Sequence, residues 1–298
     1  MGARRKTGYA IATSDGTPLF YRISGRADAD HTVVLCDGIG CDGFVWKYLR
    51  EDLADRYRLI HWHYRGHGRS PKPHDPEQIG PLTFADDLQA VLDETETESA
   101  TLMGHSMGVQ VILEAYRRHP QRVSALILVC GAPGHLLKTF RGTGSFETLL
   151  PTLRKTIDRA PRFFNAMSRV LVPTRFAWSV ATKLEVDPEL VNSVDFMPYL
   201  RGLARVEPRY FVAVLERAAA HSAHDVLEQI SVPTLVIGGE KDGFTPPKLS
   251  ESMAESIPGS ELLMVDRGTH TAPLERPGLV AEAIRGFLGR KLEKPLSP

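Results

Sequence analysis

A serine enclosed by two glycines is the strongest chemical signal in the sequence. The pentapeptide Gly-His-Ser-Met-Gly at 104–108 follows a short apolar run and precedes a helical pattern. In that strand–turn–helix setting, G-x-S-x-G forms a sharp turn that lifts the serine hydroxyl out of the sheet, and the glycines avoid clashes that a Cβ would cause. The pattern predicts that Ser106 is a nucleophile, and the positive end of the following helix would favour a forming oxyanion.

A serine hydroxyl needs a base to take its proton, and the base needs a carboxylate to orient it. His270 lies in a loop between the last predicted strand and the last predicted helix, and Asp242 follows the predicted strand 234–237. Loops at the carboxyl edge of one parallel sheet converge, and the chain order serine, acid, histidine suits that edge. We therefore predict Ser106, Asp242 and His270 as the catalytic residues, with Glu240 as a rival for the acid.

The elements that must position these residues follow a strand–helix rhythm, which is typical of βαβ units in a mainly parallel sheet. Most predicted strands are continuous apolar runs, as expected when helices cover both faces. The predicted strands are 9–13, 18–23, 32–36, 59–63, 100–104, 125–130, 234–237 and 261–265. The predicted helices are 44–54, 84–95, 107–118, 247–256 and 277–288.

The alternation of predicted strands and helices stops after about residue 134 and resumes at Val232. The sequence between these points is helical and interrupted by prolines. We predict one α/β core domain made of residues 1–134 and 223–298, with a helical cap inserted at 135–222. The whole chain has 36 basic and 36 acidic side chains, but the insertion alone has 13 basic and 8 acidic ones. The neutral chain is thus divided into a negative core and a positive cap.

The predicted cap is rich in large apolar side chains. They either pack the cap against the core or line a pocket for a hydrophobic substrate. They are Phe140, Phe146, Phe163, Phe164, Met167, Phe176, Trp178, Phe196, Met197, Tyr199 and Phe211. Residues 138–175 hold eight basic and two acidic side chains, which indicates a solvated helix face, a weak contact with an anionic membrane surface, or attraction of an anionic substrate.

Taken together, the motifs resemble the α/β-hydrolase superfamily, in particular its serine-nucleophile, lid-containing esterase and lipase-like members. The resemblance covers nearly the whole chain and is carried by five segments in order. These are Asp-Gly-Ile-Gly at 37–40, Arg-Gly-His-Gly-Arg-Ser at 65–70, the serine turn at 104–108, Gly-Glu-Lys-Asp at 239–242, and Gly-Thr-His at 268–270 followed by Glu-Arg-Pro at 275–277. It implies an eight-stranded, mainly parallel sheet with helices on both faces and a helical cap.

The resemblance also implies an oxyanion hole formed by the backbone N–H groups of Ile39 and Met107. Two departures from the family pattern stand near it. Asp37 replaces the usual histidine before the first glycine, and His63 replaces the usual aspartate two residues before Arg65. We expect the oxyanion hole to be retained, because its backbone donors do not depend on the side chain at position 37. Asp37 itself is either a specificity or pKa element or a cap for its loop.

The expected function is a serine hydrolase that cleaves a carboxylic ester with a fairly hydrophobic acyl part through an acyl-enzyme on Ser106, without a metal or an organic cofactor. A lactonase, thioesterase, carbon–carbon bond hydrolase or perhydrolase would use the same residues, and a non-catalytic ligand-binding protein is a further alternative. Haloalkane dehalogenases and related epoxide hydrolases need aspartate at the nucleophile position and dienelactone-hydrolase-like members need cysteine, so Ser106 disfavours both. Cys36 and Cys41 do not follow the turn pattern.

Composition limits the partners and the location. A balanced charge disfavours nucleic acid as a partner, so the expected partner is a small hydrophobic ester. No stretch approaches the ~18 apolar residues of a membrane span, and no apolar run follows the N-terminal basic residues as in a secretory signal. Three cysteines without a CxxC spacing indicate reduced thiols. We therefore expect a cytoplasmic protein.

Overall fold

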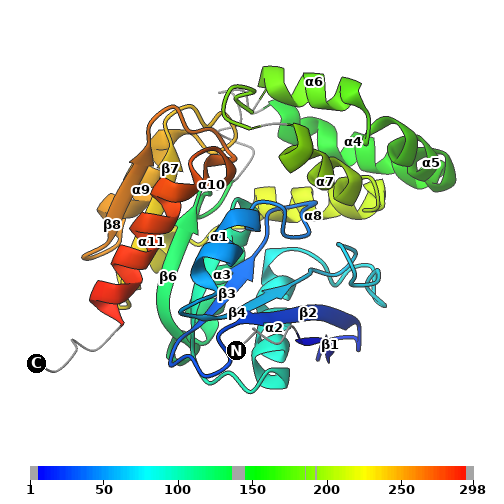
Figure 1. Ribbon diagram of the computed structural model, residues 1–298. Helices are drawn as coiled ribbons and strands as arrows, with labels where there is room; N and C mark the ends of the chain where they lie inside the picture. The colour runs from blue at the N-terminus through cyan, green and yellow to red at the C-terminus, as the bar shows by residue number, and fades with distance from the viewer. Residues whose placement is uncertain (1–5, 136–144, 185, 192, 293–298) are drawn as a thin grey trace, which may run out of the picture.

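The computed structural model describes residues 6–135, 145–184, 186–191 and 193–292, and for 145–148, 183 and 184 it describes the backbone alone. The described chain forms a central sheet with helices on both faces and a group of helices above one edge of it (Figure 1). No helix in these ranges is long and apolar enough to span a membrane.

The sheet has eight strands in the order β1-β2-β4-β3-β5-β6-β7-β8. They are β1 (Lys6–Ile11), β2 (Pro18–Gly25), β3 (Thr32–Cys36), β4 (Arg58–Trp62), β5 (Ala100–His105), β6 (Val123–Val129), β7 (Thr234–Gly239) and β8 (Glu261–Val265). Strand β2 is antiparallel to both of its neighbours, and every other neighbouring pair is parallel. The predicted mainly parallel, eight-stranded sheet is confirmed.

Helices pack on both faces of the sheet, as predicted. One face is covered by α1 (Lys47–Leu53) and α11 (Pro277–Lys291), next to the short α10 (Ala272–Glu275). The other is covered by α2 (Pro81–Glu94), α3 (Met107–Arg118) and α9 (Pro247–Ser256). Two short 3₁₀ turns, η1 (Pro120–Arg122) and η3 (His224–Gln229), precede β6 and β7.

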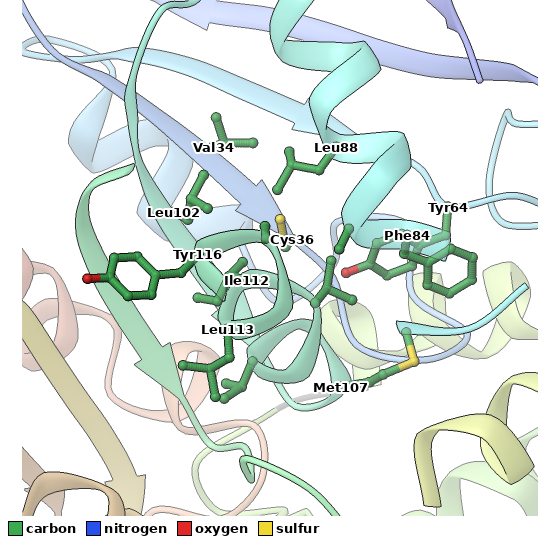
Figure 2. Packing of buried hydrophobic residues seen from close by; sticks show 14 of the residues in the cluster. Val34, Cys36, Tyr64, Phe84, Leu88, Leu102, Met107, Ile112, Leu113 and Tyr116 are labelled. Carbon is green, nitrogen blue, oxygen red and sulfur yellow. The ribbon is translucent and has the colours of Figure 1, made fainter. Parts of the chain in front are cut away.

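Each central strand sends alternate side chains into two apolar layers. In β3, Val34 and Cys36 join the layer of α2 and α3, whereas Val33 and Leu35 join the layer of α1 and α11. Figure 2 shows the first layer, in which the β3 side chains gather with Leu102 of β5 around the residues of α3. Burial on both faces explains why the strands are continuous apolar runs.

Several predicted boundaries differ from the structure, each for a local reason. Strand β1 ends at Ile11, because the following turn is closed by the Asp15 carboxylate, which accepts the N–H of Thr17 at 2.9 Å. Helix α2 begins at Pro81, three residues earlier than predicted, because proline suits the first helical position. Strand β6 ends at Val129, because Cys130 has a φ of 43°, which a strand cannot continue.

Between β6 and β7 the described residues form helices and no strand. The helices are α4 (Ser145–Arg159), α5 (Pro161–Leu171), α6 (Arg175–Leu184), α7 (Ser193–Leu203) and α8 (Pro208–Ala220). In Figure 1, α8 lies nearest the sheet, and α4 to α7 lie beyond it. An isolated antiparallel bridge joins Gly134 to Ser222, so the chain enters and leaves this segment at one place.

Ion pairs tie these helices to the rest of the molecule. Asp195 of α7 accepts from Lys47 Nζ at 2.5 Å and from the Tyr48 hydroxyl at 3.0 Å. On α8, Arg217 donates to Glu77 at 2.6 Å. These contacts hold α7 and α8 over the carboxyl edge of the sheet, where the candidate site lies.

Candidate active site

Ser106 occupies a strained turn between β5 and α3. Its φ is 56°, in the left-handed region that residues other than glycine rarely adopt. The two flanking glycines make the turn possible: a Cβ on Gly104 would lie 2.5 Å from the carbonyl oxygen of Gly108, and a Cβ on Gly108 would lie 2.3 Å from that of Cys36. The predicted role of these glycines is confirmed by their contacts, and the turn presents the Ser106 hydroxyl at the end of β5.

The structure brings the three predicted catalytic residues together. His270 Nε2 lies 2.9 Å from Ser106 Oγ, and His270 Nδ1 lies 2.9 Å from Asp242 Oδ2. The carboxylate can only accept, so it fixes the proton on Nδ1 and leaves Nε2 free to accept the serine proton. His270 is only partly buried and Asp242 is fully enclosed, so the base can meet a substrate while its orienting carboxylate cannot.

The Asp242 carboxylate is held ionised by its neighbours. Burial opposes its ionisation, but the charge and hydrogen bond of His270 and the hydrogen bonds of Thr245 outweigh burial and lower the pKa of Asp242 below its usual 3.8. Thr245 donates its hydroxyl to Oδ2 and its backbone N–H to Oδ1, each at 2.7 Å. The rival Glu240 is exposed and accepts the N–H of Arg267 instead. Asp242 is therefore the carboxylate that contacts His270.

Two further buried side chains hold the loop of His270. Glu275 accepts the backbone N–H of Thr269 at 2.6 Å and the hydroxyl of Thr271 at 3.1 Å. His105 Nε2 donates to the carbonyl oxygen of His270 at 2.8 Å. Burial and then the nearby charge of His270 lower the pKa of His105 to about 4, so its ring is neutral at pH 7. The imidazole of His270 is thus oriented from its ring by Asp242 and from its backbone by these neighbours.

Two backbone N–H groups are candidates for the oxyanion hole. Met107 is the first residue of α3, where an N–H has no acceptor inside the helix. In the described part of the chain, no acceptor is found for the N–H of Ile39 either. A Cβ on Gly38 would lie 3.0 Å from Ser106 Cβ, so the loop that carries Ile39 passes directly beside the nucleophile. Both candidate donors therefore border the space in front of Ser106 Oγ.

Asp37 anchors that loop from the side facing the core. Its buried carboxylate accepts from Trp46 Nε1 at 2.7 Å and from His61 Nε2 at 2.8 Å, and its carbonyl oxygen accepts from the Tyr64 hydroxyl at 2.8 Å. Burial opposes ionisation, but the charge and hydrogen bond of His61 lower the pKa of Asp37 below its usual 3.8. These contacts favour the interpretation of Asp37 as a loop anchor over that of a specificity element.

His63, the second departure from the family pattern, is also buried. Its Nδ1 accepts the backbone N–H of Arg69 at 2.7 Å, and its carbonyl oxygen accepts the Ser70 hydroxyl at 2.8 Å. Burial, together with the nearby His61, lowers the pKa of His63 to about 3. A neutral imidazole here joins the end of β4 to the glycine-rich loop at 65–70.

Apolar side chains lie close to His270 and to the loop of Ile39. The ring of Phe244 lies 5.0 Å from the ring of His270, centre to centre. A Cβ on Gly40 would lie 2.6 Å from Leu203 of α7 and 3.3 Å from Phe211 of α8, so both helices reach the loop of Ile39. Apolar side chains from the loop between β7 and α9, from α7 and from α8 thus border the site.

The large apolar residues of the predicted cap have different surroundings. Phe164 and Phe211 pack against a small buried cluster within the cap helices. Trp178, Phe196, Met197 and Tyr199 pack against the core layer of α1, as one of the two interpretations expects. Phe163 and Phe176 are exposed instead. Phe140 and the side chain of Phe146 lie outside the described residues.

Other features of the described chain point to no second chemistry. No group of three His, Cys, Asp or Glu side chains in these ranges has an arrangement that could hold a metal ion. Surface hollows of about 420 and 380 Å³ lie beside α1 and α11, but neither is lined by Ser106, Asp242 or His270. The three cysteines are free and buried, and burial raises the pKa of each thiol.

Comparison with known proteins decides the family. The sequence pattern of the alpha/beta hydrolase family matches residues 33–283. This chain is a member of the alpha/beta hydrolase family. "Putative carbamate hydrolase RutD" of Azorhizobium caulinodans is 29% identical over 277 residues, which are 91% of this chain and 95% of the relative.

Solved structures show the same fold. A thermophilic esterase from Thermogutta terrifontis superposes with a TM-score of 0.78 at 24% identity, covering 97% of this chain and 100% of that one. A hydrolase from Pseudomonas aeruginosa superposes with a TM-score of 0.77 at 23% identity, covering 95% and 98%. Together with the family match, the relatives identify this alpha/beta hydrolase as a hydrolytic enzyme.

Sequence reasoning missed the roles of Thr245, His105 and Glu275. Thr245 follows Asp242 by three residues, a spacing at which an aspartate commonly accepts backbone N–H groups in a turn, so the Asp-Gly-Phe-Thr run carried a usable signal. His105 and Glu275 stand in the segments quoted at 104–108 and 275–277, but nothing local marks their roles, because their partners lie in a loop whose position depends on the whole sheet.

Proposed function

We propose that this alpha/beta hydrolase is a serine esterase that cleaves carboxylic esters with a fairly hydrophobic acyl part through an acyl-enzyme on Ser106. The observation that carries the proposal is the pair of 2.9 Å contacts that join Ser106 Oγ to His270 Nε2 and His270 Nδ1 to Asp242. A hydroxyl, a base and a buried carboxylate in this order form the minimum apparatus of nucleophilic acyl transfer.

In the first half of the reaction, His270 Nε2 takes the Ser106 proton while Oγ attacks the ester carbonyl. The N–H groups of Ile39 and Met107 donate to the tetrahedral oxyanion, an effect of about 3 kcal/mol per donor in comparable enzymes. His270 then gives its proton to the departing alkoxide, and the alcohol leaves. Asp242 stabilises the transient imidazolium without taking its proton.

In the second half, His270 activates a water molecule that attacks the acyl-enzyme, and Ser106 recovers its proton as the acid departs. Every proton moves through one imidazole, so no metal or organic cofactor enters the proposed mechanism. The apolar border formed by Phe244, Leu203 and Phe211 favours a hydrophobic acyl chain over a charged one.

Covalent labelling tests the nucleophile. A fluorophosphonate reagent should label the wild-type protein at one site, and Ser106→Ala should abolish labelling and ester turnover. Ser124→Ala, which removes a half-buried serine on β6, is the matched control and should label normally. A wild-type protein that does not label would overturn the proposal, and so would a Ser106→Ala variant that does.

A panel of substrates tests which type of bond the enzyme cleaves. On p-nitrophenyl esters of rising chain length, kcat/KM should rise by roughly threefold to fourfold per methylene until the pocket is full. Lactones, acyl thioesters, ring-fission diketones and peracid formation test the alternatives that use the same residues.

The relatives named for carbamate hydrolysis favour a second candidate, cleavage of a carbamate. A kcat/KM for aryl carbamates above that for every ester would select it.

The proposed organisation has three further parts. Residues 1–134 and 223–298 form the hydrolase core, and 135–222 form a cap whose α7 and α8 border the site. The partner is a small ester-type molecule rather than a nucleic acid. The proposed location is the cytoplasm, where reducing conditions keep the three buried thiols free. Limited proteolysis that cuts first within 135–222 supports the division, and first cuts within the sheet contradict it.

A further inference from the structure

The turn that joins α5 to α6 exposes large apolar side chains. Val170 is 68% exposed, Leu171 is 55% exposed and Phe176 is 77% exposed, all within seven positions of the chain. Single exposed apolar residues are ordinary, but a cluster of this size marks an interaction site. Figure 1 shows α5 and α6 at the outer rim of the molecule, beyond α8 and away from the sheet. We call residues 169–176 the α5–α6 corner.

The apolar surface continues along α5. Phe163, Met167 and Val170 follow one another at spacings of four and three residues, so they share one face of the helix. Phe163 is 63% exposed, and α5 has no buried residue. A helix that keeps its apolar face towards solvent has the character of an interfacial helix rather than that of a core helix.

The chain segment that forms this surface carries only basic charges. From residue 159 to residue 184 the sequence has five basic side chains and no acidic one. Arg169 precedes Val170 and Leu171, and Arg175 directly precedes Phe176; within the described ranges neither arginine pairs with a carboxylate. This pattern complements an anionic surface. It opposes a symmetric contact with a second copy of the chain, which would bring the same positive charges together.

Part of the backbone of the corner is hydrogen-bonded internally. The Thr174 hydroxyl donates to the carbonyl oxygen of Leu171 at 2.7 Å and accepts the N–H of Ala177 at 3.2 Å. The N–H of Val172 donates to Ser168 O at 3.0 Å, and Pro173 has no N–H. Unpaired backbone groups are costly away from water, and these hydrogen bonds reduce their number in the corner. They thereby lower the cost of moving the corner out of bulk water.

We propose that the α5–α6 corner docks on an anionic lipid bilayer. Val170, Leu171 and Phe176 enter the interfacial region, while Arg169 and Arg175 keep their aliphatic stems beside them and place their guanidinium groups among anionic headgroups. The helices that border Ser106 are α7 and α8, so docking leaves the catalytic residues untouched. The attachment is peripheral and reversible, because one corner buries little apolar area.

Vesicle co-sedimentation of the full chain tests the proposal. The wild-type protein should bind vesicles of phosphatidylcholine mixed with phosphatidylglycerol and should not bind phosphatidylcholine alone. Arg169→Gln with Arg175→Gln should lower the partition coefficient about 25-fold, because each arginine near an anionic surface contributes about fivefold. Leu171→Ser with Phe176→Ser should lower it to background. High salt should release the wild-type protein through screening of the charges.

Matched controls separate docking from general surface effects. Ile11→Ser with Leu279→Ser removes exposed apolar groups elsewhere, and Arg56→Gln with Lys72→Gln removes exposed charges elsewhere; both should bind as wild type. All variants should hydrolyse a soluble ester at the wild-type rate, which shows that they fold. Three outcomes would overturn the proposal: no binding to either vesicle, equal binding to both, or wild-type binding by the corner variants. A wild-type dimer that Phe176→Ser converts to a monomer would assign the surface to a second copy instead.

Discussion

Helices α3 and α5 have nearly the same length, 12 and 11 residues, but their surroundings are opposite. Every residue of α3 from Met107 to Tyr116 is buried, whereas α5 buries none. Packing on all sides lets α3 hold its preceding residue, Ser106, at a φ that the residue would not adopt alone. The contrast teaches that dense packing fixes the candidate nucleophile, whereas α5, which packs through Phe164 on one side, keeps a second apolar face towards solvent.

The largest effect should come from Asp242, the acid that contacts His270. Asp242→Asn should lower kcat by about 10⁴-fold, because an amide no longer holds the required tautomer of His270 or stabilises its cation. Glu240→Gln is the control, since Glu240 is exposed and accepts the N–H of Arg267, and it should turn over like wild type. Steady-state kinetics on a p-nitrophenyl ester measures both. The reverse result would move the acid to Glu240.

A matched pair of leucines tests the contrast directly. Leu113 of α3 is fully buried, and Leu171 of α5 is 55% exposed. Leu113→Ala should lower the free energy of unfolding by about 2 to 5 kcal/mol, because it leaves a cavity, whereas Leu171→Ala should change it by about 0.5 kcal/mol or less. Urea titration at pH 7 gives both values. Equal losses would show that α5 is packed like α3.

Glycines at the second position of two helices sharpen the contrast. A Cβ on Gly108 of α3 meets backbone, whereas one on Gly278 of α11 meets nothing within 4 Å. Gly108→Ala should therefore cost about 3 kcal/mol through overpacking and also lower ester turnover by displacing the nucleophile turn. Gly278→Ala should stabilise by about 0.5 to 1 kcal/mol, since alanine loses less entropy in a helix. Stability losses of equal size would contradict the close packing at α3.

A gradual effect, reached without any mutation, is a loss of stability in mild acid. Folding lowers the pKa of His63 to about 3 and that of His105 to about 4, from an ordinary 6.5, so the unfolded chain binds protons more readily than the folded one. This stability is complete above pH 6.5 and falls as the pH drops below it, by up to about 1.4 kcal/mol per pH unit for each histidine. Urea titrations at pH 7 and 5.5 measure the fall.

His63→Asn keeps an acceptor for the Arg69 N–H and should remove about half of this acid effect. His119→Asn, at a partly exposed position, is the control and should leave the fall unchanged. If His63→Asn does not reduce the loss of stability between pH 7 and 5.5, that loss has another cause. The cause would lie outside α5 and α6, because these helices contain no histidine.

The sequence was sufficient to predict the parts of the fold that depend on local patterns. Apolar runs bounded by turns predicted each strand within a few residues, and the spacing of Gly104, Ser106 and Gly108 predicted the turn with its close contacts. Asp242 and His270 followed from their places after strands, since a parallel sheet gathers such loops at one edge. The contact between them is now observed, while their catalytic role stays a prediction.

Other features could not be read from local patterns. The direction of the Asp37 side chain depends on Trp46 and His61, which reach it only in the folded sheet. The periodic apolar residues of α5 indicate an amphipathic helix, but periodicity does not say whether that face meets the core, solvent or another surface. Packing the cap against the core was one interpretation of its aromatics. It holds for Phe196 and fails for Phe163.

The bridge between Gly134 and Ser222 has a consequence for how this molecule could diversify. Around it, the N–H of Ala223 donates to Pro133 O at 2.8 Å, and the N–H of His135 donates to His221 O at 3.0 Å. The two ends of the segment therefore leave the sheet as a paired stalk. A stalk of this kind accepts a longer, shorter or unrelated segment without moving any strand, so substrate choice can change while the nucleophile turn and its base remain in place. The same stalk offers a natural junction for exchanging this segment between hydrolases.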